Sequence, residues 1–413
     1  MVVAAGVGAV LAGSTLAFAD GPRSNGHDDG QFRAEVQRRL TDLSHINHRQ
    51  VCDNPANGDA SCTARTVTDA AGTPKTATLP SGYGPAQLLS AYGLSGTSSA
   101  ATAPIIAIVD AYDDPYAASD LAKYSSTFNI PQLPTCSGSI SSSKTPCFQK
   151  VNQTGSTSRM PYVNAGWALE TSLDVQTAHA TCQNCKILLV EANSASFNDL
   201  LKAIDTATAI GAKVVSGSWG ASEFAGETSY DSHFNHSNVA YTFSAGDSGY
   251  GTLYPAASPY VTAVGGTSLL LNPDNSYFSE TVWNGTGGGC SKYESKPTWQ
   301  HDTLCAKRTM NDVAAVADPA TGVAVYDSVR YGGQSGWFQV GGTSLSAPLI
   351  ASVYAMSGNT TGAANSLPYT LASATNLHDV SNGINGSCGL LCTAAAGYDS
   401  PTGLGTPIGV TAF

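Results

Sequence analysis

The chain has 413 residues, of which 42% are hydrophobic and only 12% are charged, and it contains 43 glycines. This profile predicts one large, loop-rich globular domain and excludes a disordered or fibrous protein. The net charge of −11 argues against nucleic-acid partners, because binding to nucleic acid depends on lysines and arginines that neutralise phosphates.

The first segment resembles an export signal. Residues 1–19 are small or apolar, carry no charged side chain and end in Ala17-Phe18-Ala19, which is typical of a signal peptide with an A-x-A cleavage site. Because the usual basic start is absent, an uncleaved apolar tail and a start codon further upstream stay open as alternatives. No later stretch is apolar enough to span a bilayer. We therefore expect a secreted, extracellular protein with no membrane attachment after signal cleavage.

The ten cysteines lie as five pairs of neighbours along the chain. An even count with local spacing in an exported protein favours disulfides. The predicted pairs are Cys52–Cys62, Cys136–Cys147, Cys182–Cys185, Cys290–Cys305 and Cys388–Cys392. A zinc site or a redox pair at Cys182 and Cys185 is the alternative. It is disfavoured because no second ligand pair lies nearby at zinc spacing and the pair does not open a helix after a first strand.

Two regions follow the signal. Residues 20–82 are polar, with one helical patch at residues 31–43, and we interpret them as a short leader or pro-segment outside the core. From residue 83 to residue 413, apolar runs alternate with helical patterns. The expected strands are 104–109, 186–190, 213–218 and 239–243, and the expected helices are 116–128, 167–181, 197–210 and 345–356. This alternation predicts an α/β fold with a parallel central sheet covered by helices on both faces.

Two polar segments follow expected strands. In a parallel sheet, ligands bind at the carboxyl ends of the strands. Asp247 lies just past the strand that ends at Phe243, and Ser216-Gly217-Ser218-Trp219-Gly220 lies at the end of the strand that starts at Lys213. We expect both segments to border a functional site.

Ser344 is a candidate nucleophile. It follows Gly341-Gly342-Thr343 and opens a helical pattern, so its hydroxyl and N–H would project from a helix N-terminus, where the dipole favours developing negative charge. Pro348 would fall in the first turn of that helix, where a missing N–H is tolerated. A Gly-Thr-Ser segment at a helix start is often only an N-cap, so the assignment depends on the other motifs.

Glu170 and Asp174 form a carboxyl pair. Their spacing of i and i+4 places both on one face of the helix expected at residues 167–181. Like charges so close raise one pKa and let the pair share a proton. An isolated pair of this kind normally lies in solvent, but the flanking residues here are apolar. We therefore predict a buried pair.

Three motifs follow one another along the chain. They are Glu170-Thr171-Ser172-Leu173-Asp174, Ser244-Ala245-Gly246-Asp247-Ser248-Gly249 and Gly342-Thr343-Ser344-Leu345-Ser346-Ala347-Pro348. These motifs and their order along the chain resemble those of the sedolisin family, the serine-carboxyl peptidases. Members of this family share the subtilisin-like fold and use glutamate in place of histidine. The resemblance covers residues 83–413. It implies that Ser344 is the nucleophile, that Glu170 is its general base and that Asp174 orients Glu170 and shares its proton. It also implies that Asp247 is the oxyanion-hole donor and that residues 216–220 pair with an extended protein or peptide substrate.

Asp247 separates this chain from subtilisins, which place asparagine at this point. A carboxyl group must be protonated to donate a hydrogen bond to an oxyanion, so we expect activity in acid. An ordinary Asp-x-Gly turn is the alternative interpretation of this segment.

The resemblance also implies a calcium site near the C-terminus. Calcium takes carboxylate and carbonyl oxygens in a shell of six to eight ligands. The implied ligands are the carboxylates of Asp379 and Asp399 and the carbonyls of Val380, Ala395 and Gly397. Ala395 stands where relatives often have glycine, but a carbonyl ligand requires no particular side chain.

The predicted function is that of a secreted, monomeric, calcium-stabilised serine-type endopeptidase, which hydrolyses peptide bonds in proteins through an acyl-enzyme. The first alternative is a secreted, catalytically inactive pseudopeptidase or binding protein. The second is a subtilisin-type peptidase with a displaced Ser-His-Asp triad that uses Asp110. It is disfavoured because none of the eight histidines stands in the His-Gly-Thr-His setting of subtilisins. We expect Asp110 only to end the first strand.

Overall fold

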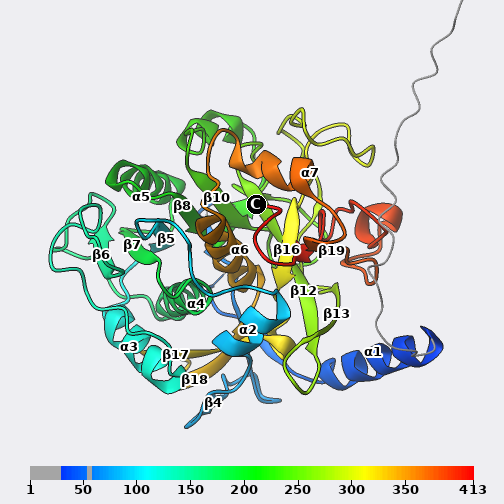
Figure 1. Cartoon of the computed structure of the whole chain (residues 1–413), viewed down its shortest axis with the longest axis horizontal. Helices are drawn as coiled ribbons and strands as arrows, with labels where there is room; N and C mark the ends of the chain where they lie inside the picture. The colour runs from blue at the N-terminus through cyan, green and yellow to red at the C-terminus, as the bar shows by residue number, and fades with distance from the viewer. Residues whose placement is uncertain (1–28, 54–57) are drawn as a thin grey trace, which may run out of the picture.

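The computed structural model describes residues 29–53 and 58–413. Its centre is an eight-stranded sheet with the strand order β13-β12-β10-β8-β5-β7-β6, in which β16 also pairs with β12 (Figure 1). The strands are β5 (Ile105–Ala111), β6 (Phe148–Asn152), β7 (Lys186–Ala192), β8 (Val214–Gly217), β10 (Ala240–Ser244), β12 (Thr262–Leu271), β13 (Tyr277–Val282) and β16 (Val313–Val316). All their pairings are parallel except that of β12 with β13. The predicted parallel sheet is therefore present.

Helices cover both faces of this sheet. On one face, α4 (Ala165–Thr181) and α6 (Thr343–Ser357) pack against each other, and the Ser352 hydroxyl of α6 donates to the carbonyl of Ala178 in α4 at 3.2 Å. On the other face, α5 (Phe197–Ile210) packs against β5 and β7. Nearly every residue of α4 and α6 is buried, as expected for helices that are enclosed by protein on all sides. The sheet and these two helices form the main core.

Smaller helices and strands complete the fold. The helices are α2 (Pro85–Ala91), α3 (Ala117–Phe128) and α7 (Leu367–Leu371), and 3₁₀ helices occupy Glu227–His233, Pro319–Thr321, Ala364–Ser366 and Gly389–Cys392. The short strands are β11 (Leu253–Tyr254), β14 (Gly289–Cys290), β15 (Thr309–Met310), β19 (Leu377–His378) and β20 (Thr406–Pro407). The helices and strands predicted from residue 104 onward are confirmed to within about two residues, and α5 has the predicted bounds.

The start of α6 differs from the prediction. The helix begins at Thr343, so Pro348 is its sixth residue and lies beyond the first turn. Our placement of Pro348 in the first turn was wrong. Because proline has no N–H, the carbonyl of Ser344 loses its partner four residues along the helix. The Ser218 hydroxyl replaces that partner and donates to the Ser344 carbonyl at 3.3 Å, which ties the helix start to the neighbouring loop.

The leader takes part in the fold. The short strands β1 (His48–Gln50), β3 (Arg65–Val67) and β4 (Thr76–Ala77) join the hairpin of β17 (Val323–Tyr331) and β18 (Gln334–Gly341) in a five-stranded sheet. Val51, Cys62 and Ala64 are buried in the main hydrophobic core. The expectation that the leader lies outside the core is therefore wrong for these residues. The domain boundary near residue 83 stays a prediction, and the predicted signal peptide at residues 1–19 lies outside the described residues.

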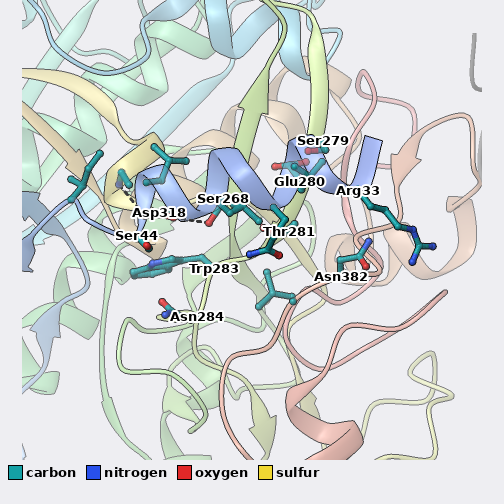
Figure 2. A pocket seen from close by; sticks show the side chains of 18 of the residues that line it. Arg33, Ser44, Ser268, Ser279, Glu280, Thr281, Trp283, Asn284, Asp318 and Asn382 are labelled. Carbon is teal, nitrogen blue, oxygen red and sulfur yellow. Dashed lines mark hydrogen bonds between the residues drawn. The ribbon is translucent and has the colours of Figure 1, made fainter. Parts of the chain in front are cut away.

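The helical patch predicted in the leader forms α1 (Asp29–Leu43), which lies at the edge of the molecule near β13 (Figure 1). Arg39 donates to the carbonyl of Leu271 at 2.9 Å and stacks over the ring of Phe278, whose centroid lies 4.5 Å from its guanidinium carbon. A cavity of about 530 Å³ remains between α1, β12 and β13 (Figure 2). The helix therefore rests on the sheet edge through a few contacts, without close packing along its length.

All five predicted disulfides form, and no described cysteine is free. The bond between Cys182 and Cys185 confirms the predicted pairing of these two cysteines. Among residues 29–53 and 58–413, no helix combines the length and the apolar character that a membrane span requires.

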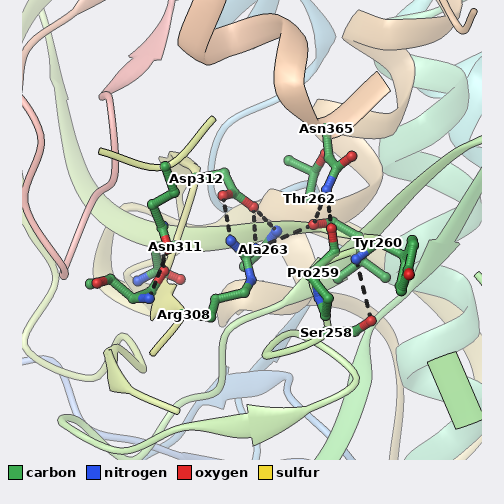
Figure 3. A network of polar contacts seen from close by, with 12 residues as sticks. Ser258, Pro259, Tyr260, Thr262, Ala263, Arg308, Asn311, Asp312 and Asn365 are labelled. Atoms are coloured by element: carbon green, nitrogen blue, oxygen red, sulfur yellow. Dashed lines mark hydrogen bonds and ion pairs between the residues drawn. The ribbon is translucent and has the colours of Figure 1, made fainter. Parts of the chain in front are cut away.

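A buried ion pair joins two loops to the sheet (Figure 3). Arg308 and Asp312 are fully buried, and the guanidinium donates to both carboxylate oxygens at 2.6 and 3.0 Å. The same carboxylate accepts from the backbone N–H of Ala263 in β12 at 2.7 Å and from the Tyr369 hydroxyl at 2.7 Å. Asp312 thereby fixes the start of β12 relative to the loop that enters β16.

This network gives a prediction about stability. Asp312→Ala should lower the free energy of unfolding by about 3–5 kcal/mol, because it leaves the buried Arg308 charge without its partner. Arg38→Ala is the control, since Arg38 is exposed on α1 and its ion pairs with Glu35 and Asp42 are solvated. Denaturant unfolding monitored by fluorescence measures both effects. Equal midpoints for the two variants would contradict the structural role of the network.

Candidate active site

The structure brings the four predicted catalytic residues to one place. Glu170 and Asp174 lie in α4, Ser344 is the second residue of α6, and Asp247 follows β10. The side chains of Glu170, Asp174 and Ser344 are fully buried, and Asp247 is 8% exposed. The prediction that the Glu170–Asp174 pair is buried is confirmed. The catalytic roles of the four residues stay predictions.

The carboxyl pair is positioned by the start of α4. The Asn164 side chain caps the helix and accepts from the N–H groups of Gly166 and Trp167 at 3.0 and 3.2 Å. The helix is then buried from Gly166 to Thr181. Glu170 and Asp174 therefore project from one face of a rigid helix that contacts α6.

Burial controls the electrostatics of the pair. It raises the pKa of both Glu170 and Asp174 well above the ordinary range, and the charge of Asp110 raises both further. The interaction between the two carboxyls lowers the pKa of Glu170 and raises that of Asp174. Both carboxyls of the buried pair therefore favour the protonated form.

Ser344 lies beside Glu170. Its hydroxyl lowers the pKa of Glu170, as a hydroxyl that donates to a carboxylate does. The well-aligned hydrogen bonds of the Ser344 hydroxyl, however, are with other groups. The hydroxyl lies 3.0 Å from the Thr63 hydroxyl and 3.4 Å from the carbonyl of Ser218. Neither oxygen of Glu170 has a well-aligned partner among the described residues.

Asp110 is a third member of this carboxyl cluster. It lies within β5, one residue before the end of the strand, and is fully buried. Burial raises its pKa to about 7. We expected Asp110 only to end the first strand, and the sequence analysis missed its position next to Glu170 and Asp174. The available signal was an acidic residue inside an otherwise apolar strand, since a buried charge requires a reason.

The displaced Ser-His-Asp triad finds no support in this geometry. None of the groups that set the pKa of Asp110, Glu170 or Asp174 is a histidine. His179, on the same helix as the carboxyl pair, instead contacts the carbonyl of Pro131 at 2.8 Å.

Asp247 and Ser344 both lie near the backbone carbonyl oxygen of Thr63. One carboxyl oxygen of Asp247 accepts from the N–H and the hydroxyl of Thr343 at 2.8 and 2.9 Å. The carbonyl of Thr63 accepts from the N–H of Ser344 at 3.3 Å. A Cβ atom at Gly342, which has φ +102°, would collide with both this carbonyl oxygen and the second Asp247 oxygen. The two oxygens therefore face each other across a residue that must be glycine.

The groups around the Thr63 carbonyl oxygen are of the kind that form an oxyanion hole. Burial raises the pKa of Asp247 to about 7, so its carboxyl is protonated in acid. The Asp247 oxygen that faces Thr63 has no well-aligned partner among the described residues. A protonated carboxyl and a backbone N–H aimed at one carbonyl oxygen would stabilise a negative charge that develops there.

The predicted substrate-pairing segment divides into two parts. Ser216 and Gly217 lie within the central sheet, where Ser216 is paired with Ile108 and Gly217 with Phe243. Ser216 is also paired with Thr242 on its other side, so its backbone has no free edge for a substrate strand. A role of Gly217 in substrate binding stays a prediction. Ser218 leads from the sheet into β9 (Trp219–Ser222), whose edge pairs with β2 (Ser61–Cys62) of the leader.

A cavity of about 800 Å³ lies beside β2 and Thr63. The aromatic side chains of Phe197, Phe224 and Tyr230 line it, and Asp247 borders it on the side of the carboxyl cluster. The cavity is therefore continuous with the candidate active site and offers room for apolar side chains.

The predicted calcium ligands lie in neighbouring loops. Asp379 accepts from the N–H of Gly397 at 2.8 Å, and Asp399 accepts from the N–H of Ala395 at 3.0 Å. Burial raises the pKa of Asp399 to about 7, and the charge of Asp379 raises it further. Two carboxyls that repel each other, with carbonyls nearby, make an oxygen donor set suited to a calcium ion. No cluster of three or more His, Cys, Asp or Glu side chains that could hold a metal occurs within the described ranges.

Comparisons with known proteins bear on the family. A model described as the subtilase family matches residues 163–389. Sedolisin from Pseudomonas sp. (strain 101) is 37% identical over 175 residues, which cover 38% of this chain and 29% of the relative. Kumamolisin from Bacillus sp. (strain MN-32) is 33% identical over 281 residues, which cover 58% of this chain and 49% of the relative. The chain belongs to the sedolisins within the subtilase family. It spans half or less of the length of these curated relatives.

Solved structures agree with the sedolisin assignment. Pseudomonas sedolisin, a serine-carboxyl proteinase complexed with two molecules of pseudo-iodotyrostatin, superposes with a TM-score of 0.65 at 29% sequence identity. The match covers 80% of this chain and 96% of that chain. A psychrophilic protease, S41, matches in fold with a TM-score of 0.50 at 16% identity. The predicted subtilisin-like α/β fold of this sedolisin is confirmed.

The buried carboxyls of this sedolisin predict how stability depends on pH. Burial raises the pKa of Asp110, Asp247 and Asp399 to about 7 and that of Glu191 to about 9. A pKa that is higher in the folded than in the unfolded chain means that the folded chain binds protons more tightly, so stability is greatest in acid. Stability should fall as pH rises from about 4 through about 9. The Asp110 shift alone corresponds to up to roughly 4 kcal/mol.

Thermal unfolding at constant ionic strength with a calcium chelator present measures this dependence. We expect the midpoint to fall from pH 4 to pH 9 and the slope to become shallower in Asp110→Asn. A midpoint that rises over this range would show that the buried carboxyls are paired with cations in solution.

Proposed function

We propose that this protein is a secreted serine-carboxyl endopeptidase that hydrolyses peptide bonds in proteins through an acyl-enzyme in acid. The convergence of the Ser344 N–H and the Asp247 carboxyl on one carbonyl oxygen, beside a serine hydroxyl and a proton acceptor, carries the proposal. The names of its relatives, a sedolisin and a serine-carboxyl proteinase, support the same reaction class.

The proposed reaction uses the buried groups in order. The Ser344 hydroxyl attacks the substrate carbonyl and gives its proton to Glu170, while Asp174 holds Glu170 through the shared proton. The oxyanion takes hydrogen bonds from the Ser344 N–H and from protonated Asp247. Glu170 then passes its proton to the leaving amine, and an acyl-enzyme ester forms on Ser344. Water hydrolyses that ester in the reverse sequence of proton transfers.

The proposed acidic optimum follows from Asp247. The carboxyl can donate a hydrogen bond to the oxyanion only while it is protonated, and its pKa is raised by burial to about 7. The donor is therefore lost as pH rises through about 7. An asparagine in its place would donate at any pH.

Secretion and a monomeric state belong to the same proposal. Five disulfides favour an oxidising, extracellular location, as does the signal-like sequence of residues 1–19. No specific observation favours the inactive pseudopeptidase.

Hydrolysis of a denatured protein between pH 3 and pH 8 tests the proposal. We expect activity to be greatest in acid and to decline through about pH 7, and both Ser344→Ala and Glu170→Gln should lower it by at least about a thousandfold. Ser352→Ala, further along α6, and Glu191→Gln, a buried carboxyl outside the site, are the matched controls and should retain activity.

Two outcomes would contradict the proposal. Full activity in Ser344→Ala would mean that another group is the nucleophile. A folded chain without activity at any pH would support the pseudopeptidase or binding protein instead.

We also propose that Ca²⁺ binds the loops of Asp379 and Asp399, with the carbonyls of Val380, Ala395 and Gly397 completing the donor set. When bound, the ion supplies positive charge that offsets the repulsion between the two carboxylates. Asp399 also accepts from the N–H and the hydroxyl of Thr402 at 2.8 and 2.9 Å. The proposed role of the ion is to stabilise these C-terminal loops, with no part in the peptidase reaction.

Calcium should raise the thermal midpoint of the inactive Ser344→Ala chain, in which self-digestion cannot interfere. At a hundredfold excess over the dissociation constant, the expected stabilisation is about 2.7 kcal/mol. Asp379→Asn should abolish the response. Asp274→Asn, an exposed turn residue, should leave it unchanged. An equal response in the Asp379 variant would place the ion elsewhere.

A further inference from the structure

The loop that carries Asp247 is held by a glycine-rich segment that contains Gly285 and Gly287. The N–H of Gly287 donates to the carbonyl of Gly246 at 2.8 Å, and Gly246 directly precedes Asp247. The N–H of Gly249 donates to the carbonyl of Gly285 at 2.8 Å. A Cβ atom at Gly287 would collide with a backbone carbonyl oxygen of the loop. The position of Asp247 therefore depends on where the glycine-rich segment lies.

The peptide group of Gly246 is fixed on its other side by the helix of the candidate nucleophile. Its N–H donates to the hydroxyl of Thr343 at 2.9 Å, and that hydroxyl donates to Asp247 at 2.9 Å. Thr343 directly precedes Ser344. Gly246 thus lies between Gly287 and the start of α6. A shift of Gly287 would therefore change the distance between the Asp247 carboxyl and the Ser344 N–H.

Asn311 holds the glycine-rich segment from the interior of the protein. Its side chain is fully buried and lies in the loop between β15 and β16 (Figure 3). The amide nitrogen donates to the carbonyl of Gly287 at 2.9 Å and to the carbonyls of Ser400 and Pro401 at 2.8 and 3.0 Å. One side chain thereby joins the segment beside Asp247 to a C-terminal loop.

Asn385 donates to the same segment from another loop. Its side chain is buried, and its amide nitrogen lies 3.0 Å from the carbonyl oxygen of Thr286 and 3.4 Å from that of Gly287. The backbone carbonyl of Asn385 accepts from the N–H of Tyr250 at 2.8 Å. Asn385 therefore holds both the glycine-rich segment and the chain that follows Asp247.

Asn311 carries two energetic costs at once. A buried amide costs free energy unless it is hydrogen-bonded. Asn311 also has a φ of +80°, which is uncommon for residues other than glycine. Strained residues of this kind cluster at functional sites. Here both costs fall on a residue that reaches the peptide group before Asp247 through Gly287 alone.

We propose that Asn311 and Asn385 are positioning residues for the peptidase reaction, which hold the Asp247 carboxyl in the oxyanion hole through Gly287. This inference rests on the proposed peptidase function. Both asparagines act through the backbone of Gly287 and take no part in proton transfer. Because oxyanion-hole donors stabilise the transition state more than the bound substrate, loss of either amide should lower kcat and leave KM nearly unchanged.

The same contacts keep Asp247 away from water. Burial raises its pKa to about 7, while hydrogen bonds from Thr343 and the charge of Arg65 on β3 lower it. The carboxyl of Glu170 on α4 also interacts with Asp247. A looser loop admits water, which brings the pKa of Asp247 back toward its ordinary range. The activity of a variant without the amide should therefore be lost at lower pH than that of the parent chain.

Hydrolysis of a fluorescently labelled denatured protein between pH 3 and pH 8, at constant calcium concentration, tests the proposal. Asn311→Gly removes the amide and keeps a residue that adopts positive φ. We expect kcat to fall by about 10- to 100-fold with little change in KM. The alkaline limb of the pH profile should move down by about half a pH unit or more. Asn385→Ala should change both readouts in the same direction.

Asn365→Ala is the matched control. Asn365 is also a buried asparagine, and its amide donates to the carbonyls of Pro259 and Val261 at 2.8 and 3.2 Å. The control should lose thermal stability, as the other two variants do, but keep the parent kcat and pH profile. All assays are run well below the thermal midpoint of each variant, and circular dichroism checks that each is folded.

Inhibition by a peptide aldehyde gives a second measurement. The Ser344 oxygen bonds to the aldehyde carbon, the hydroxyl proton passes to Glu170, and the aldehyde oxygen becomes an oxyanion that accepts from the oxyanion-hole donors. Such an adduct resembles the transition state. Its inhibition constant should therefore rise by about the factor by which kcat/KM falls in Asn311→Gly and Asn385→Ala, and stay unchanged in Asn365→Ala.

The outcomes separate the inference from the proposed function. If the parent chain is active and the folded Asn311→Gly and Asn385→Ala variants keep its kcat and pH profile, the positioning role is wrong and the proposed function stands. Lower activity with an unchanged inhibition constant would also overturn the role, because the oxyanion hole would then be intact. If Asn311→Gly does not fold, Asn385→Ala decides. If the parent chain is inactive, the proposed function fails and the inference fails with it.

Discussion

The burial of three carboxyl groups beside Ser344 is the constraint on which the rest of this structure depends. Asp110, Glu170 and Asp174 are fully buried, and the largest causes that raise their pKa values are burial and neighbouring carboxyl groups. Without a counter-charge, the cluster is tolerated only when it retains protons. The stability of the fold is therefore expected to favour acidic conditions, as does the chemistry proposed for the site.

The fold meets this constraint with rigid, enclosed elements. The apolar environment that raises the carboxyl pKa values comes from β5, α4 and α6, which are buried along most of their length. Because Pro348 has no N–H, the Ser344 carbonyl lacks its hydrogen bond within the helix. It accepts a hydrogen bond from the Ser218 hydroxyl at 3.3 Å instead. The loop that leads to the edge strand β9 is thereby tied to Ser344 at the start of α6. The position of Ser344 is set by this bond as well as by packing.

Local sequence pattern predicted the elements and the residues whose spacing matters within one element. The i, i+4 spacing placed Glu170 and Asp174 on one buried face, and the apolar runs located the strands of the central sheet. Pairings between distant segments were not predictable in this way. β2 has two residues and β3 has three, which is too short to show a period. The placement of Thr63 against Ser344, 281 residues apart in sequence, depends on those pairings. Ser216, which is paired on both sides within the central sheet, was expected at the substrate edge because the boundary between a central strand and an edge strand has no local signature.

The covered site also reconciles two observations that otherwise conflict. A nucleophile must reach its substrate, yet Ser344 is fully buried and its hydroxyl is within 3.0 Å of Thr63. An external substrate could pair with β9 only after residues 61–64 leave that edge, because each side of a strand edge accepts one partner. The leader is held there by short strands and by side-chain contacts across Ala64, while α1 is only loosely packed over its cavity (Figure 2). Access of an extended substrate to the edge of β9 therefore requires that β2 detach from it, and the Ser344 N–H and the Asp247 carboxyl are already in place in the covered state.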